Sequence, residues 1–220
     1  MSAASQPPPS RARRTYVIRI IRLVFGLVLF GLGAASMVIA DLGLAPWEVF
    51  HQGISDRTGI PIGTVGIITG IFVLLLWIPL RERIGIGTLL NVLVIGVVID
   101  ITLYLASYEG DSIWFRLGLM LFGVLLFGVG SGFYIGAGLG PGPRDGVMTG
   151  LARRGLRIGP VRVAIEASVL VAGWLLGGTV GLGTVVFALT VGPLIAWFLP
   201  PLTYELETAP APPPTRSKAA

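Results

Sequence analysis

Six long apolar runs with almost no charged residues are the feature that most limits how this chain can fold. They cover approximately residues 17–40, 64–80, 86–106, 115–136, 160–177 and 182–200, and each is bounded by Gly, Pro or charged residues. An α-helix rises about 1.5 Å per residue, so roughly 20 residues cross a hydrocarbon core about 30 Å thick. The runs therefore predict an all-α, polytopic membrane protein with six transmembrane helices.

The composition fits a chain surrounded by lipid. Of the 220 residues, 54% are apolar and only 12% are charged, which no ordinary soluble domain matches. The first run resembles a secretory signal, but residues 17–40 are longer than the apolar core of a signal peptide, so we expect a retained helix. The absence of Cys excludes disulfides, thiolate metal sites and a Cys nucleophile.

The distribution of Lys and Arg indicates how the spans are oriented. With the N-terminus in the cytoplasm, 14 of the 16 basic residues fall in inner segments, and only Arg57 and Arg116 fall outside. This separation follows the positive-inside rule, and five or seven spans would spoil it. Because the basic residues flank apolar runs, anionic lipid accounts for them better than nucleic acid does. We therefore predict cytoplasmic termini and no nucleic-acid partner.

The sequence contains an internal repeat. A shift of 97 residues aligns 25–53 with 122–150, and 11 of these 29 positions are identical. A shift of 96 then aligns two further motifs, around Gly63 and Gly159 and around Gly85 and Gly181. Each unit holds three spans, an odd number, so the second unit would enter the membrane from the opposite side. Inverted repeats of this kind recur in secondary transporters.

The repeat divides the chain into five segments. The polar, Pro-rich ends at 1–14 and 203–220 are predicted to be disordered cytoplasmic tails. Residues 15–106 form the first three-helix unit, 107–114 an outer loop, and 115–202 the second three-helix unit. The predicted fold is thus a 3+3 inverted repeat.

Each unit also contains a short polar segment between its first two spans. Pro46 and Pro143 suit a first helical turn, and Glu48 and Asp145 favour the positive end of the helix dipole. A helix of about 12 residues is too short to cross the bilayer. Two interpretations stay open: re-entrant half-helices whose N-termini point to a central cavity and bind an anion or carboxylate, or interfacial connectors.

Two stretches carry a resemblance to a known family. The runs at 41–53 and 58–65, which include Leu42-Gly43-Leu44-Ala45-Pro46-Trp47-Glu48, and the run at 84–91 resemble the YczE-like family of bacterial integral membrane proteins, relatives of the YitT group. The resemblance covers roughly residues 17–200. It implies a multi-span fold in the bacterial plasma membrane, and it implies little about activity.

Ionisable residues within apolar runs are costly and need a reason. Asp100 and Asn91 lie nine residues apart on the third span, on roughly opposite faces. Arg162 and Glu166 lie on one face of the fifth span and can pair. They align with Gly66 and Gly70 of the first unit, so a charged pair replaces a close-packing motif.

His51, the only histidine, is either a proton-handling group or an interfacial residue. No metal site is visible because further ligands at matching spacing are missing. No catalytic constellation or phosphate loop can be assembled, so we expect neither an enzyme nor a cofactor.

These features favour a small-solute transporter or permease whose path lies between the two units. An accessory or scaffold protein that binds another membrane or export component is the alternative, and a channel is a third. Expected partners are the lipid bilayer, a small solute, and a second copy or another membrane protein. The candidate substrate path includes Pro46, Glu48, His51, Gln52, Asn91, Asp100, Pro143, Arg144, Asp145, Thr149, Arg162 and Glu166.

Overall fold

The computed structural model describes residues 9–106 and 112–204, and the regular structure in these ranges is entirely α-helical. The helices are α1 (Pro9–Ala40), α2 (Pro46–Thr58), α3 (Ile62–Leu75), α4 (Trp77–Leu80), α5 (Ile86–Leu105), α6 (Ile113–Gly136), α7 (Pro143–Ala152), α8 (Ile158–Leu175) and α9 (Leu182–Leu202). The all-α prediction is confirmed.

Six stretches of the described chain are long and apolar enough to cross a membrane, which confirms the predicted number of spans. They are Arg14–Ala40, Ile62–Leu80, Ile86–Leu105, Ile113–Gly136, Ile158–Leu175 and Leu182–Leu202. Large apolar side chains such as Trp197 and Leu189 are exposed on the outside of the bundle. Water would oppose so much exposed apolar surface, whereas lipid solvates it.

Two segment boundaries differ from those predicted from the sequence, and two predicted segments lie partly outside the described residues. Helix α1 already begins at Pro9, within the segment predicted as a tail, because proline suits a first turn and arginine is a good helix former. The second span breaks between α3 and α4, where Pro79 cannot donate a backbone hydrogen bond to Leu75. Residues 107–111 of the predicted outer loop and 205–220 of the predicted tail lie outside the described residues.

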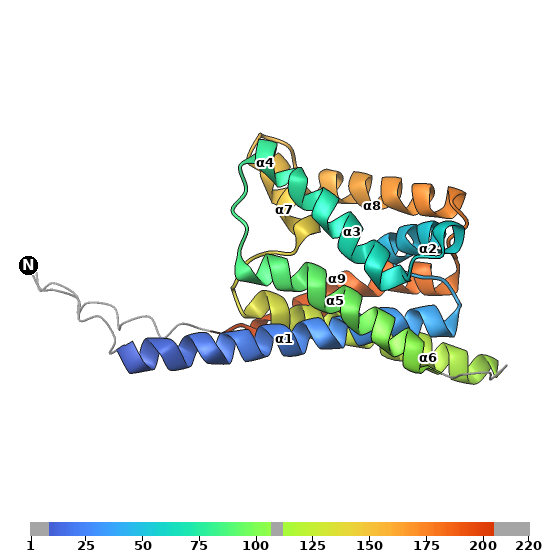
Figure 1. The fold of residues 1–220 in the computed structure, drawn as a ribbon, viewed down its shortest axis with the longest axis horizontal. Helices are drawn as coiled ribbons and strands as arrows, with labels where there is room; N and C mark the ends of the chain where they lie inside the picture. Colours follow the sequence, from blue (N-terminus) through green and yellow to red (C-terminus); the bar gives the residue numbers. More distant parts are fainter. Residues whose placement is uncertain (1–8, 107–111, 205–220) are drawn as a thin grey trace, which may run out of the picture.

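The helices form two layers (Figure 1). Helices α1, α5, α6 and α9 pack together in one layer, and α2, α3, α4, α7 and α8 form the other. The centre of the first layer is the antiparallel pair of α1 and α6. A methyl group added at Gly26 would lie 2.7 Å from the carbonyl oxygen of Gly130, so these backbones are nearly in contact.

Contacts between the two units come in reciprocal pairs related by the sequence shift. Gly26 faces Gly130 while Gly33 faces Gly123, each at 2.7 Å from the added methyl to the facing oxygen. Arg19 Nε donates to the Ala137 carbonyl at 2.7 Å, and the equivalent Arg116 Nε donates to the Ala40 carbonyl at 2.8 Å. Two units related by a two-fold axis would make such contacts. Their orientation relative to a bilayer stays a prediction.

The two short helices, α2 and α7, lie at opposite ends of the molecule (Figure 1). Their N-terminal turns are inside the bundle, since Pro46, Trp47, Glu48 and Pro143 are buried. The C-terminal end of α2 is exposed from Asp56 onward. Each short helix thus has its N-terminus inside the bundle and its C-terminus at the surface. Whether the two helices are re-entrant or interfacial stays a prediction.

Candidate functional site

A cavity of about 200 Å³ lies between the two units and takes side chains from both of them. Its walls come from the first-layer helices α1, α5, α6 and α9 and from α2, α3, α7 and α8 of the second layer. Phe30 and Phe127, which are equivalent in the repeat, contact each other edge to face at 4.3 Å between ring centroids. The predicted path residues that line the cavity are Pro46, Glu48, His51, Asn91, Pro143, Arg144, Asp145, Arg162 and Glu166.

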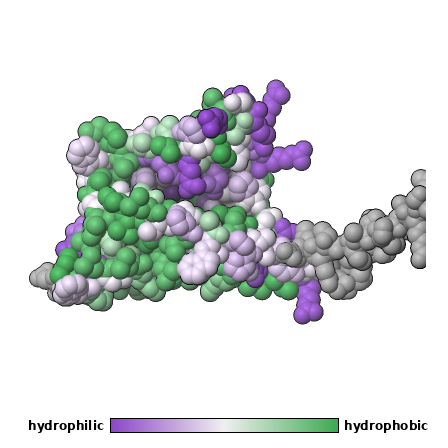
Figure 2. All heavy atoms as spheres, turned by 180° about the vertical axis from the view of Figure 1, so that it is seen from behind, coloured by the Kyte–Doolittle hydropathy of each residue, from purple (hydrophilic) through white to green (hydrophobic). Residues whose placement is uncertain are grey.

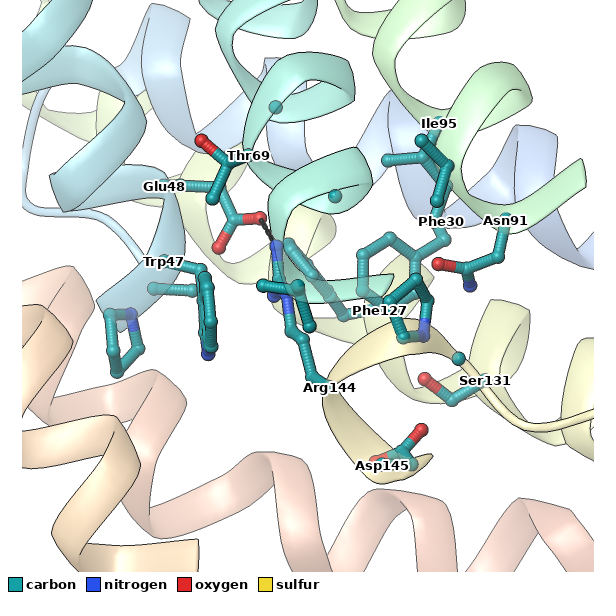
Figure 3. A pocket seen from close by; sticks show the side chains of 18 of the residues that line it. Phe30, Trp47, Glu48, Thr69, Asn91, Ile95, Phe127, Ser131, Arg144 and Asp145 are labelled. Atoms are coloured by element: carbon teal, nitrogen blue, oxygen red, sulfur yellow. Dashed lines mark hydrogen bonds and ion pairs between the residues drawn. The ribbon is translucent and has the colours of Figure 1, made fainter. Parts of the chain in front are cut away.

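The centre of the site is a contact between the two short helices (Figure 3). Arg144 of α7 extends toward α2, where its Nη2 lies 3.3 Å from Glu48 Oε1. Its guanidinium carbon also lies 4.5 Å from the centroid of the Trp47 ring. Glu48 is only 3% exposed, whereas the Arg144 side chain is 32% exposed. A charged residue of one unit is therefore held by a carboxylate and an indole of the other.

The other charged groups of the cavity have partners of their own. The Tyr134 hydroxyl donates to Asp145 Oδ2 at 3.1 Å. Arg162 Nε donates to Glu166 Oε1 at 3.0 Å, within α8. The two residues therefore pair along the helix as the four-residue spacing predicts.

Two buried polar atoms of α2 have no hydrogen-bond partner among the described residues: Glu48 Oε2 and His51 Nε2. His51 packs beneath Gly66 and is only 4% exposed, so its imidazole is buried within the protein. Helix α2 is outside the six candidate spans. Burial, with a smaller effect of the Arg144 charge, lowers the pKa of His51 from 6.5 to about 3. The imidazole is therefore neutral at ordinary pH and does not act as a cation in the site.

Three predicted path residues lie outside the cavity lining and have structural contacts. Gln52 Oε1 accepts a hydrogen bond of 2.7 Å from the backbone N–H of Thr179, which ties α2 to the turn before α9. Thr149 donates to the Gly146 carbonyl within α7. Asp100 accepts from the Gly63 N–H at 2.6 Å and from the Thr64 hydroxyl at 2.7 Å. Asp100 thus caps α3, whose own N-cap residue, Pro61, provides no side-chain acceptor.

The two units differ at the seam beside the cavity. In the first unit α3 packs on α5, and a methyl group added at Gly63 would overlap the Gly96 carbonyl oxygen. The equivalent glycines of α8 and α9 are Gly159 and Gly192. A methyl group added at either would meet no described atom within 4 Å.

The α8 seam is thus open where its counterpart is closed. Hydrophilic side chains gather in a hollow between two apolar bands on the face shown in Figure 2. Arg162 and Glu166 of α8 both line the cavity and are partly exposed, with side-chain exposures of 48% and 36%.

The sequence analysis missed four members of the site whose side chains can form hydrogen bonds: Trp47, Thr69, Ser131 and Tyr134. One signal was available for Trp47, because the 97-residue shift aligns it with Arg144. Residues at equivalent positions of two repeat units can meet near the two-fold axis that relates the units. An aromatic residue aligned with an arginine therefore suggests that the two contact each other. Thr69, Ser131 and Tyr134 carry no such signal, because each is a common residue on a long apolar helix.

The six candidate spans and the apolar exterior define a polytopic helical membrane protein, here with a cavity between its two halves that both apolar and charged side chains line. A model of a family of unknown function, DUF6198, matches residues 17–200, and the chain belongs to this family. An uncharacterized protein of Haemophilus influenzae is 42% identical over 178 residues, 80% of this chain and 81% of the relative.

The uncharacterized membrane protein YczE of Bacillus subtilis is 35% identical over 195 residues, 86% of this chain and 88% of the relative. The resemblance to the YczE-like family is therefore confirmed. YyaS of the same organism, also called uncharacterized, is 24% identical over 186 residues, 80% and 89% of the two chains. No solved structure matches the chain.

Proposed function

We propose that this protein transports a small solute across the bacterial plasma membrane through the cavity between its two units. The observation that carries the proposal is the cavity itself, in which Glu48 of one unit pairs with Arg144 of the other inside a largely apolar bundle. Buried charges are costly in such surroundings and mark ligand or ion paths in membrane proteins. A dry, tightly packed interface would instead favour an accessory protein.

The difference between the seams supports a moving transporter. In the first unit α3 packs closely on α5. In the second unit α8 is separated from α9, although the equivalent glycines are present. If the units exchange these conformations, α8 closes on α9 while α3 opens from α5. Two units of opposite orientation would then expose the cavity to one side and to the other in turn.

The proposed gates are the inner turns of the short helices, Pro46–Gln52 and Pro143–Thr149. Both helix N-termini border the cavity, while the helices extend from it toward opposite ends of the bundle. The ion pair between Glu48 and Arg144 joins the two gates in this structure. This is a non-enzymatic function, with both termini in the cytoplasm.

Alternating exposure can be tested with a single cysteine in the cavity, because the natural chain has none. Ser131 lines the cavity and is 2% exposed. In the Ser131→Cys variant, we expect a membrane-impermeant thiol reagent to react from outside in intact cells and from inside in inverted vesicles. Asp56→Cys on the exposed end of α2 is the matched control and should react from one side only.

Two results would contradict transport through this cavity. Reaction of the Ser131→Cys thiol from one side only would indicate a blind pocket, as in an accessory protein. A channel would instead let the reagent reach the Ser131→Cys thiol from both sides at once. The reagent would also pass through the protein into vesicles.

A further inference from the structure

The position between Glu48 and Trp47 has the chemistry of a cation site. A buried carboxylate lies on one side and the face of an indole ring on the other, and both come from the first turn of α2. Carboxylates and tryptophan faces are the groups that bind ammonium and guanidinium ions in proteins. In this structure the Arg144 guanidinium occupies the position.

Arg144 holds this position loosely. It makes a single hydrogen bond to Glu48, with one long distance of 3.3 Å, and about a third of its side chain is exposed in the cavity. The second oxygen of the same carboxylate, Oε2, has no partner within the described part of the chain. A bound ligand with several N–H donors would satisfy this oxygen, which the arginine leaves unpaired.

The charge balance of the cavity also favours a cation. Five acidic or basic side chains line it: three carboxylates (Glu48, Asp145, Glu166) and two guanidiniums (Arg144, Arg162). Arg162 pairs with Glu166 and Arg144 pairs with Glu48, whereas Asp145 accepts a hydrogen bond from the neutral hydroxyl of Tyr134. The positive ends of α2 and α7 offset part of this excess. One added positive charge completes the balance, whereas an anion would increase the number of unpaired negative groups.

We propose that the cavity binds a small organic monocation, an amine or a guanidine, whose charged group displaces Arg144 from Glu48 and Trp47. Phe30, Phe127 and Tyr134 then enclose the apolar part of the solute. The bound cation then replaces Arg144 as the partner of Glu48, and Glu166 keeps Arg162. A cavity of about 200 Å³ limits the solute to a size below that of typical drug ligands. This assignment of a substrate class rests on the proposed function.

Calorimetric titration of the full-length protein in lipid nanodiscs tests the assignment with methylguanidinium as the probe. We expect binding of methylguanidinium and none of acetate or of N-methylurea, which has a similar shape without the charge. Glu48→Gln should weaken methylguanidinium binding at least tenfold. The control is Asp56→Asn, which removes an exposed carboxylate from the same helix and should change the affinity less than twofold.

A second variant separates a binding role of this site from a purely structural one. Arg144→Met removes the resident cation, so the protein should lose thermal stability and recover it when methylguanidinium is added. We expect the probe to raise the melting temperature of Arg144→Met more than that of the natural protein. Acetate should have no such effect.

Binding of acetate that requires Arg144 would overturn the assignment to cations. So would an affinity for methylguanidinium that Glu48→Gln leaves unchanged, or a failure of both the binding and the rescue. These outcomes are distinct from the accessibility of Ser131→Cys. Two-sided accessibility with acetate binding would retain transport and reject the cation, whereas cation binding with one-sided accessibility would retain the site and reject transport.

Discussion

Long polar side chains of this protein satisfy the ends of helices that belong to other parts of the chain. Arg57 donates to the carbonyls of Leu175 and Leu176 at the end of α8, and Arg116 to those of Ala40 and Asp41 at the end of α1. Free carbonyls at a helix C-terminus attract cations. This explains why the two arginines assigned to the outer side are retained against the positive-inside pattern.

Such roles could not be predicted from the sequence. The charge pattern identified Arg57 and Arg116 as exceptions, and it identified Asp100 as an ionisable residue within a span. Their partners lie 36 to 119 residues away in the chain. Because no local pattern encodes such a contact, the sequence could indicate that each residue needs a reason but not which reason applies.

His51 provides a test of burial at the scale of one residue. Its pKa is lowered from 6.5 to about 3 in the folded protein, so between these values only the unfolded chain binds the proton. Folded stability should therefore fall as the pH is lowered from about 6.5 toward 3, by up to about 1.4 kcal/mol per pH unit. His51→Gln should remove this part of the dependence.

The measurement is thermal unfolding of both proteins in detergent at pH 8, 7, 6 and 5. The difference in melting temperature between His51→Gln and the natural protein should be constant from pH 8 to 7 and should then shift in favour of the variant. Parallel curves down to pH 5 would show that the histidine is not buried in this way.

At the scale of elements, local signals predicted the helices well. Pro46 was correctly predicted to lie in the first turn of α2, because proline fits that position, and Gly59, with a positive φ of 73°, ends the helix. The seam between α8 and α9 was not predictable in this way. Its glycines match those of the closed seam in the sequence, and only the structure distinguishes the packed pair from the separated one.

Gly192→Leu tests whether this seam closes during function. No described atom lies within 4 Å of a methyl group added at Gly192, so the variant should fold with a stability within about 0.5 kcal/mol of the natural protein. A leucine would prevent α8 from closing on α9. In the Ser131→Cys background we expect labelling from one side to slow at least tenfold.

The matched control is Gly118→Leu, on α6, where a methyl group likewise meets no described atom within 4 Å. It should leave the labelling of the Ser131→Cys thiol unchanged from both sides. Equal labelling in the two leucine variants would mean that the α8 seam remains open throughout the functional cycle.

At the scale of the whole molecule, the repeat was the most informative sequence feature. It predicted how many spans each half contains. It also aligned residues that make equivalent contacts, Arg19 and Arg116, and residues that contact each other, Trp47 and Arg144. It could not indicate a cavity, because an interface between two units can be packed or hollow with the same alignment. Side-chain volume across several helices determines that outcome.

The claim on which the other inferences depend is that the two three-span units are inserted in opposite orientations and enclose the cavity between them. The most direct measurement uses single cysteines at Ser55 in α2 and Ala152 in α7, which occupy equivalent positions in the repeat. Opposite insertion predicts that an impermeant maleimide labels Ser55→Cys from outside the cell and Ala152→Cys only from inside. Labelling of both from the same compartment would contradict it.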